Sequence, residues 1–178
     1  METYSCSRFK SIKTPKPTGF DSLYMILVEI KIGVYQKQIE EIRAQENPSK
    51  SPLKDRLPLF TPTGIFNYRS MAGLESYNGI ICLDIDSVED PESLKSVCKT
   101  ISWVYSAFVT PSGKGLKVIV KTDATPETYK EVEISVSNKF AELTGFSRDN
   151  HCKDIARVQF VSYDPQIYIN ENSTKFTF

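Results

Sequence analysis

The sequence predicts a single α+β domain, with a mixed or antiparallel sheet and flanking helices. Amphipathic helical patterns alternate with short apolar strands along its 178 residues, as expected of a chain that contains both kinds of element. A glycine-containing turn at 111–115 joins two strands directly, and strands joined by so short a turn must run antiparallel. The length suits one domain with a sizeable core.

The composition is that of an ordinary globular protein, and the net charge of the chain indicates no class of binding partner. Apolar residues make up 40% of the chain and charged residues 25%, while 22 Lys and Arg balance 22 Asp and Glu. A nucleic-acid binder with this balance needs a local basic patch. The four cysteines show no paired spacing, so with one histidine they predict neither a zinc finger nor a disulfide framework. Without a signal peptide or an uninterrupted apolar span, the sequence predicts a cytoplasmic protein with no membrane partner.

The first 50 residues are expected to form a helical N-terminal portion. Asp21 is the expected N-cap of a helix that Gly33 ends, because the apolar residues between them recur at helical spacing. A second amphipathic segment places three side chains on one face: Tyr35, Ile39 and Ile42. The polar, proline-containing stretch 46–55 is expected to be a loop.

Residues 55–170 are expected to form the core of the domain. An apolar strand over 79–86 is followed by a helix that Asp90 and Pro91 open. The apolar positions of this helix recur at helical spacing, which predicts its buried stripe as Leu94, Val97, Cys98 and Ile101.

Three further patterns complete the predicted core. Residues 103–110 and 116–121 predict the two strands of the hairpin. A long helix opens at Thr125-Pro126 and ends at Gly145, and its predicted inward side chains are Tyr129, Val132, Val136, Phe140 and Leu143. Residues 155–161 predict a last strand.

The strand over 79–86 carries the first candidate site. Alternate side chains of a strand share a face, so Asp84 and Asp86 should lie together while Leu83 and Ile85 pack on the other face. Two carboxylates this close repel unless a cation lies between them. Mg²⁺ commonly binds one or two carboxylates together with substrate phosphates. The alternative is a strand that simply ends in an acidic turn, because Ser87, Glu89 and Asp90 follow.

The stretch 110–121 is the local basic patch. It contains no acid and three lysines: Lys114, Lys117 and Lys121. Gly113 and Gly115 allow a sharp turn that presents backbone amide groups to an anion. In the strand that follows, Lys117 and Lys121 should point the same way. The alternative is a hairpin turn with ordinary surface lysines, and the P-loop pattern is not matched anywhere.

An arginine in the last predicted strand is the third candidate. Arg157 follows Asp149 and Asp154, and an arginine among apolar strand residues usually meets a carboxylate or a phosphate. The alternative is a structural ion pair with Asp154 or Asp164. His151, the only histidine, lies in a polar stretch and is expected to be solvated.

Four stretches, taken in order, resemble the VirE N-terminal domain family of the archaeo-eukaryotic primase superfamily. They are LPLFTPTGIF (57–66), GIICLDID (79–86), TPSGKGLKVIV (110–120) and RDNHCKDIARVQFVSYDP (148–165). The resemblance implies an RRM-like sheet with an added N-terminal αβ unit, as in a primase-polymerase core. It also implies metal-dependent nucleotidyl transfer of the DNA primase or polymerase type.

The resemblance further implies which residues form the site. Asp84 and Asp86 match the D-x-D that binds Mg²⁺ or Mn²⁺, and Asp149 matches the third acid, with Asp154 as the alternative. The family's phosphate-contacting segment corresponds to Ser112, Gly113, Lys114 and Lys117, where Lys117 replaces the usual histidine. Arg157 is expected to support the phosphates from the neighbouring strand.

The expected function is therefore binding of a nucleoside triphosphate and single-stranded DNA or RNA, in replication of chromosomal or mobile-element DNA. A replicative helicase module is a further expected partner. The first alternative is a non-catalytic module that binds nucleotide or nucleic acid. A weaker alternative is a haloacid-dehalogenase-type phosphatase, because LDIDSV (83–88) also resembles that family's D-x-D-x-[TV] motif.

Overall fold

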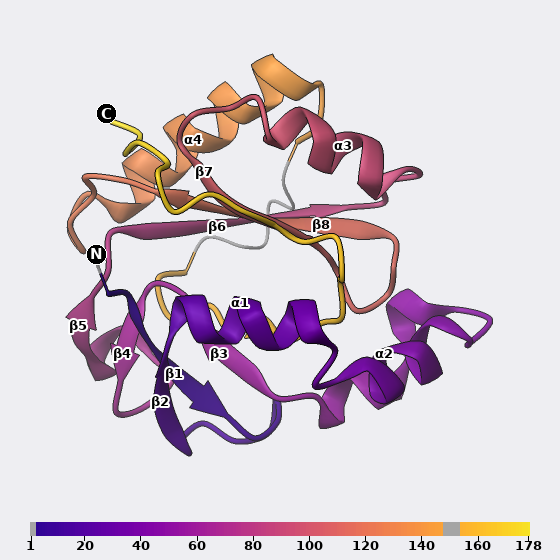
Figure 1. The fold of residues 1–178 in the computed structure, drawn as a ribbon. Coiled ribbons are helices and arrows are strands. Elements are labelled where there is room, and N and C mark those ends of the chain that lie inside the picture. Colours follow the sequence, from indigo (N-terminus) through magenta and orange to yellow (C-terminus); the bar gives the residue numbers. More distant parts are fainter. Residues whose placement is uncertain (1–2, 148–153) are drawn as a thin grey trace.

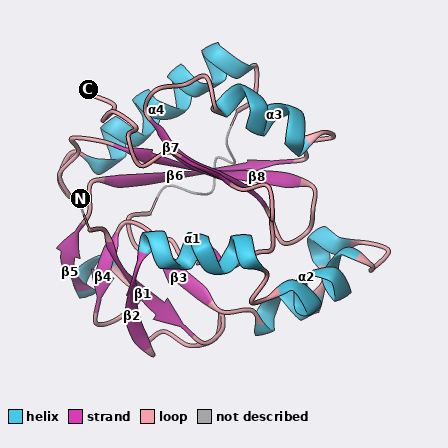
Figure 2. Cartoon of the chain, viewed as in Figure 1, coloured by secondary structure: helices cyan, strands magenta, loops and turns pink. Residues whose placement is uncertain are grey.

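The computed structural model describes residues 3–147 and 154–178, and it confirms the α+β class (Figures 1 and 2). These residues contain four α-helices and three sheets whose strand pairs are all antiparallel. The helices are α1 (Leu23–Ile32), α2 (Gln36–Arg43), α3 (Pro91–Cys98) and α4 (Tyr129–Thr144). The strands are β1 (Ser5–Phe9), β2 (Gly19–Ser22), β3 (Leu59–Thr61), β4 (Gly64–Phe66), β5 (Leu74–Tyr77), β6 (Ile80–Asp86), β7 (Val104–Val109), β8 (Gly115–Lys121), β9 (Gln159–Phe160) and β10 (Tyr168–Ile169).

The central sheet has the strand order β10-β7-β8-β6 and is covered on both faces. Figure 1 shows α3 and α4 above this sheet, and α1 with β1–β3 below it. On the upper face, Leu83 and Ile85 of β6 pack in one core with buried side chains of α3 and α4. The lower face carries Ile80 and Cys82 of the same strand into a second core shared with α1. The alternation expected for 79–86 therefore supplies two cores, one for each face.

A second sheet, with the order β2-β1-β3-β9, adds two strands to the N-terminal portion, whose two expected helices are α1 and α2. β1 and β2 form a hairpin before the first helix, and Asp21 belongs to β2. The N-cap of α1 is Ser22, whose hydroxyl accepts a hydrogen bond from the Met25 N–H at 3.2 Å. Asp21 instead pairs with Arg8 across the hairpin. The sequence pattern missed these strands because they are short and only partly buried.

Three other local predictions need correction. Val97 and Leu143 were expected in the core, but their side chains are 39% and 47% exposed. Lys95 is buried instead, because its ammonium pairs at 2.7 Å with the buried Asp164 carboxylate. The predicted strand 155–161 is reduced to β9, and Arg157 precedes it in a turn.

One predicted end of each of three helices agrees with the structure. Gly33 and Gly145 end α1 and α4 in the left-handed conformation, and the Asp90 carboxylate caps α3. Cys82 and Cys98 are buried free thiols, as is Cys6, and burial raises the pKa of Cys98 to about 12. Within the described residues, no helix combines the length and apolar character needed to cross a membrane.

Candidate functional site

The main candidate site is a pocket of about 470 Å³ at the end of β6. Its lining combines carboxylates, cations and a few apolar side chains. The lining residues are Ile12, Lys54, Arg69, Asp84, Asp86, Thr110, Pro111, Ser112, Lys117, Asp154, Ala156, Arg157, Val158 and Phe160. These residues come from segments far apart in the sequence, so the pocket depends on the complete fold.

Asp84 and Asp86 reach this pocket because of the strand periodicity of β6. Both line the pocket. Leu83, which precedes Asp84, and Ile85, which lies between the two aspartates, are fully buried on the opposite face. Asp84 is only 8% exposed, whereas Asp86 is exposed at the strand end. The next residue, Ser87, has a φ of 56°, in the left-handed region that non-glycine residues seldom adopt. The chain therefore turns sharply just after the second aspartate.

Lys117 lies directly opposite Asp84 in the β6–β8 register. Its ammonium forms an ion pair with the Asp84 carboxylate, and both side chains are nearly buried. Burying two charges costs solvation free energy, which their mutual attraction must offset. The carboxylate is thus already neutralised by a cation that belongs to the protein itself.

The turn between β7 and β8 contributes unevenly to the pocket. Ser112 lines it, and its hydroxyl lies 3.1 Å from the Thr110 hydroxyl, within hydrogen-bond distance. Gly113, with a φ of 75°, instead lines a neighbouring cavity that includes Arg43. Lys114 is exposed and lines neither cavity, although its carbonyl accepts a hydrogen bond from Val88 N–H at 3.1 Å. The nucleotide roles predicted for Gly113 and Lys114 remain predictions.

Asp154 and Arg157 reach the pocket from the turn that precedes β9. The Asp154 carboxylate accepts the Ala156 N–H at 2.9 Å, and the Asp154 carbonyl accepts the Arg157 N–H at 3.0 Å. This local turn directs both residues to one cavity. Asp149, the first choice for the third acid, lies outside the described residues, as does His151.

Sequence reasoning missed two cations that line the pocket, Lys54 and Arg69. Lys54 belongs to the stretch expected to be a loop, which contains two short 3-10 helices, and its ammonium lies 5.8 Å from the Phe160 ring centre. Arg69 belongs to a turn between β4 and β5. No local pattern marks either residue, because only tertiary folding brings them beside β6.

The electrostatics of these two cations favour an anionic ligand. Burial lowers the pKa of Lys54 from its usual value, and the nearby charge of Lys117 lowers it further. Nη1 of Arg69 is buried and has no hydrogen-bond partner among the described residues. A buried donor left unsatisfied costs free energy, which a ligand oxygen would recover.

The pocket suits a metal only together with an anionic ligand. Among the described residues, no group of three His, Cys, Asp or Glu side chains is close enough to hold a metal ion. Asp84 and Asp86 could supply two carboxylates, and Mg²⁺ often takes its remaining ligands from phosphates and water. The lining has four cationic side chains (Lys54, Arg69, Lys117, Arg157) against three carboxylates (Asp84, Asp86, Asp154). The cationic side chains would repel a free metal ion, and the carboxylates would repel a free phosphate. A metal–phosphate complex can bind the carboxylates through its metal and the cations through its phosphate.

Comparison with known proteins gives one match. The model of the family described as "BT4734-like, N-terminal domain" matches residues 52–169, so the chain belongs to this family. No curated protein matches the chain, and neither does any solved structure.

This match corrects the family resemblance drawn from the four sequence stretches. The family is different from the VirE N-terminal domain family, and the match provides no link to the primase superfamily. The D-x-D and glycine-lysine stretches are short, and short motifs of this kind occur in unrelated families.

Proposed function

We propose that this member of the BT4734-like N-terminal domain family binds a nucleoside triphosphate as its complex with Mg²⁺ or Mn²⁺. We further propose that it uses this complex for nucleotidyl transfer on a single-stranded nucleic acid. The observation that carries the proposal is the shared pocket, in which Asp84 and Asp86 lie beside four cationic side chains. Phosphate and metal chemistry need both kinds of group within one cavity.

The pocket residues fall into two groups, the carboxylates that would bind the metal ion and the cations that would bind the phosphates. Asp84 and Asp86 would hold the metal ion, which would neutralise the phosphates and polarise the reacting phosphoryl group. Lys117 and Arg157 would contact phosphate oxygens, since charge-assisted hydrogen bonds are stronger than neutral ones. Lys54 and Arg69 line the same pocket and would supply two further cations for the phosphates. Asp154 is the described acid that could complete the metal site on binding.

The Asp84–Lys117 pair supports binding of the two ligand components together. A metal bound to Asp84 would displace the Lys117 ammonium, which is buried and would be left without its counter-ion. A triphosphate arriving with the metal supplies that counter-ion. The protein should therefore take the metal–nucleotide complex in preference to either component alone.

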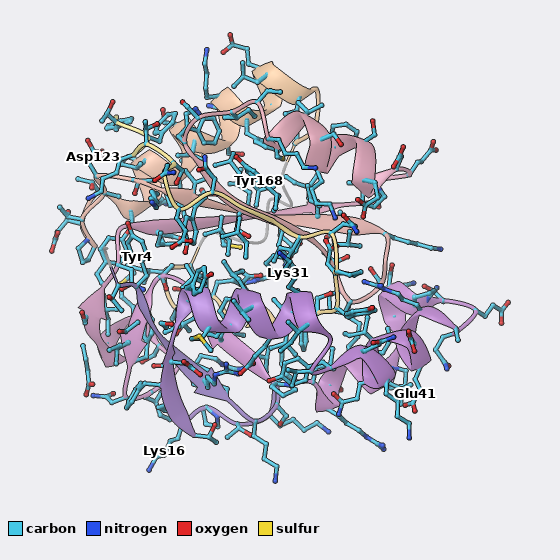
Figure 3. The ribbon with its side chains drawn as sticks, in the orientation of Figure 1. Tyr4, Lys16, Lys31, Glu41, Asp123 and Tyr168 are labelled. Atoms are coloured by element: carbon cyan, nitrogen blue, oxygen red, sulfur yellow. The ribbon has the colours of Figure 1, made fainter. Side chains whose placement is uncertain are left out.

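Calorimetric titration tests the binding part of the proposal. The wild-type protein should bind a nucleoside triphosphate in the presence of Mn²⁺ and much more weakly without it. Asp86→Asn should abolish the metal dependence, and it is the suitable variant because Asp86 is exposed and its loss spares the core. Asp123→Asn is the matched control, since this exposed acid follows the opposite end of β8 (Figure 3). Equal effects of the two substitutions would contradict the proposal.

Primer synthesis and extension on a single-stranded template test the transfer part. Metal-dependent binding with no extension by the wild type would favour a non-catalytic nucleotide-binding module. Release of phosphate from a simple phosphate ester, lost in Asp84→Asn, would favour the phosphatase alternative, in which Asp84 attacks phosphorus. Extension that is lost in Asp86→Asn and retained in Asp123→Asn is the result expected here.

A further inference from the structure

We propose that a second cavity beside the pocket binds the phosphate backbone of the single-stranded nucleic acid. This cavity, called here the basic groove, has a volume of about 420 Å³ and is lined by Lys10, Ser11, Lys13, Pro52, Asp55 and Arg56. The inference rests on the proposed function only for the choice of a single strand as the occupant. The binding surface itself is defined by its own residues.

The basic groove adjoins the pocket through two shared chain segments. Ser11 and Lys13 line the groove, while Ile12 between them lines the pocket. In the same way, Pro52 and Asp55 line the groove, while Lys54 lines the pocket. The two cavities therefore share these two segments as a common boundary, and an extended ligand could occupy both.

The charge of the groove favours a polyanion. Three cationic side chains line it, Lys10, Lys13 and Arg56, against the single carboxylate of Asp55. None of these cations forms an ion pair with another described residue. All three are exposed, and residues 10–20 contain no acid. Figure 3 shows Lys16 of the same segment projecting from the side of the molecule formed by β1 and β2.

The walls of the groove are held in place by backbone contacts. In the β1–β2 connection, the Thr14 N–H donates to Ser11 O at 3.0 Å and the Thr18 N–H to Arg8 O at 2.8 Å. The Arg69 N–H donates to Pro15 O at 2.8 Å, which ties this connection to a pocket residue. A site held open before binding loses less conformational entropy when its ligand arrives.

A single-stranded nucleic acid fits these features better than an isolated phosphate. Its regularly spaced phosphates can contact cations in the groove while one of its nucleotides reaches the pocket. The pocket would then hold the incoming nucleotide beside the bound strand, as nucleotidyl transfer on a strand requires. Contacts to phosphate alone carry no sequence information, so binding should be insensitive to base sequence.

Fluorescence anisotropy with a labelled single-stranded oligonucleotide tests the inference without nucleotide or metal. The triple variant Lys10→Gln, Lys13→Gln, Arg56→Gln should weaken binding at least tenfold. Loss of three phosphate contacts should also reduce the slope of log K against log salt concentration by about 2. The matched control is Lys99→Gln, Lys130→Gln, Lys139→Gln, which removes the same charge from exposed positions in or next to α3 and α4.

Three outcomes would overturn the inference: no oligonucleotide binding by the wild type, equal losses in both triple variants, or equal affinity for a polyglutamate of similar charge. Calorimetry with Mn²⁺ and nucleoside triphosphate keeps the proposed function separate. The groove variant should retain that binding, because its three residues do not line the pocket. If the wild type binds the oligonucleotide through the groove but binds no nucleotide, the proposed function is wrong, whereas the inference that the basic groove binds a single strand is supported.

Discussion

Lys117 and Asp84 face each other across β8 and β6, and their side chains form an ion pair at the wall of the main pocket. The sequence predicted that the two aspartates would repel each other unless a cation lay between them. The structure supplies that cation for Asp84 from the adjacent strand. The pair consequently has two effects: each partner compensates a nearly buried charge, and Lys117 occupies a carboxylate that a metal would need.

The stability losses from removing Asp84 and Lys117 one at a time should add up to more than the loss from removing both together. Asp84→Asn or Lys117→Gln alone leaves one nearly buried charge without its counter-ion, and each should reduce the free energy of unfolding by about 3 kcal/mol. The double variant should lose less than the sum, since no charge is left uncompensated. Urea unfolding of the four proteins measures the coupling. Additive losses would show that the ion pair is energetically unimportant.

Lys117→Gln should have opposite effects on the binding of metal and of nucleotide. Without the competing ammonium, Mn²⁺ alone should bind more tightly than it does to the wild type. The affinity for the nucleoside triphosphate should fall by about 1.5–3 kcal/mol, the value of one charge-assisted hydrogen bond. Calorimetry with each ligand separately, at one pH, provides the measurement. Metal affinity that falls or stays constant in this variant would rule out the competition.

Triphosphate binding should weaken at alkaline pH because of Lys54. Burial and the charge of Lys117 lower the pKa of Lys54, so its positive charge is lost at a lower pH than that of an exposed lysine. Affinity should therefore begin to decrease at a pH below the usual lysine pKa of about 10.4. Lys54→Arg should remove this part of the decrease, because arginine stays protonated throughout. An identical pH profile in both proteins would exclude Lys54 from the site.

Gly115→Ala should damage the pocket through the backbone. A Cβ atom at Gly115 would lie 2.6 Å from the Ile85 carbonyl oxygen, which is between the two aspartates of β6. Relief of this contact must separate β8 from β6, at a cost of about 1–3 kcal/mol. Nucleotide affinity should fall together with stability, as measured by calorimetry and thermal unfolding. Gly19→Ala is the control, since no heavy atom of the described residues, apart from Gly19 and its chain neighbours, lies within 4 Å of its added Cβ, and it should change neither property.

The core elements could be predicted because their patterns are strong and local. The apolar run that forms β6, the glycine-containing turn before β8, the Asp90 cap of α3 and the Gly145 end of α4 are each visible within a few residues, whereas α4 begins at Tyr129 rather than at Thr125-Pro126. The hairpin β1–β2 was missed, since short and partly buried strands lack a clear alternation. The burial of Lys95 could not be predicted, because its buried partner, Asp164, is 69 residues away.

The candidate site was predictable only where its residues share a strand or a turn. Asp84 and Asp86 follow from strand periodicity, and Ser112 and Lys117 belong to one recognisable stretch. The pairing of Asp84 with Lys117 required the register of two strands, which the sequence does not encode in any single segment. Lys54 and Arg69 became visible only through tertiary contacts, for the same reason.

The lower core, between the central sheet and α1, makes the boundary of the family match a poor place to divide the protein. The match begins at residue 52, yet Cys6, Leu23 and Leu27 pack in one cluster with Cys82 and Ile119 of the central sheet. A fragment that started at residue 52 would expose this apolar face to water and would favour self-association. A chimaera that exchanges this domain between family members should therefore carry residues 3–51 together with residues 52–169, because the segment that folds as one unit is longer than the matched segment.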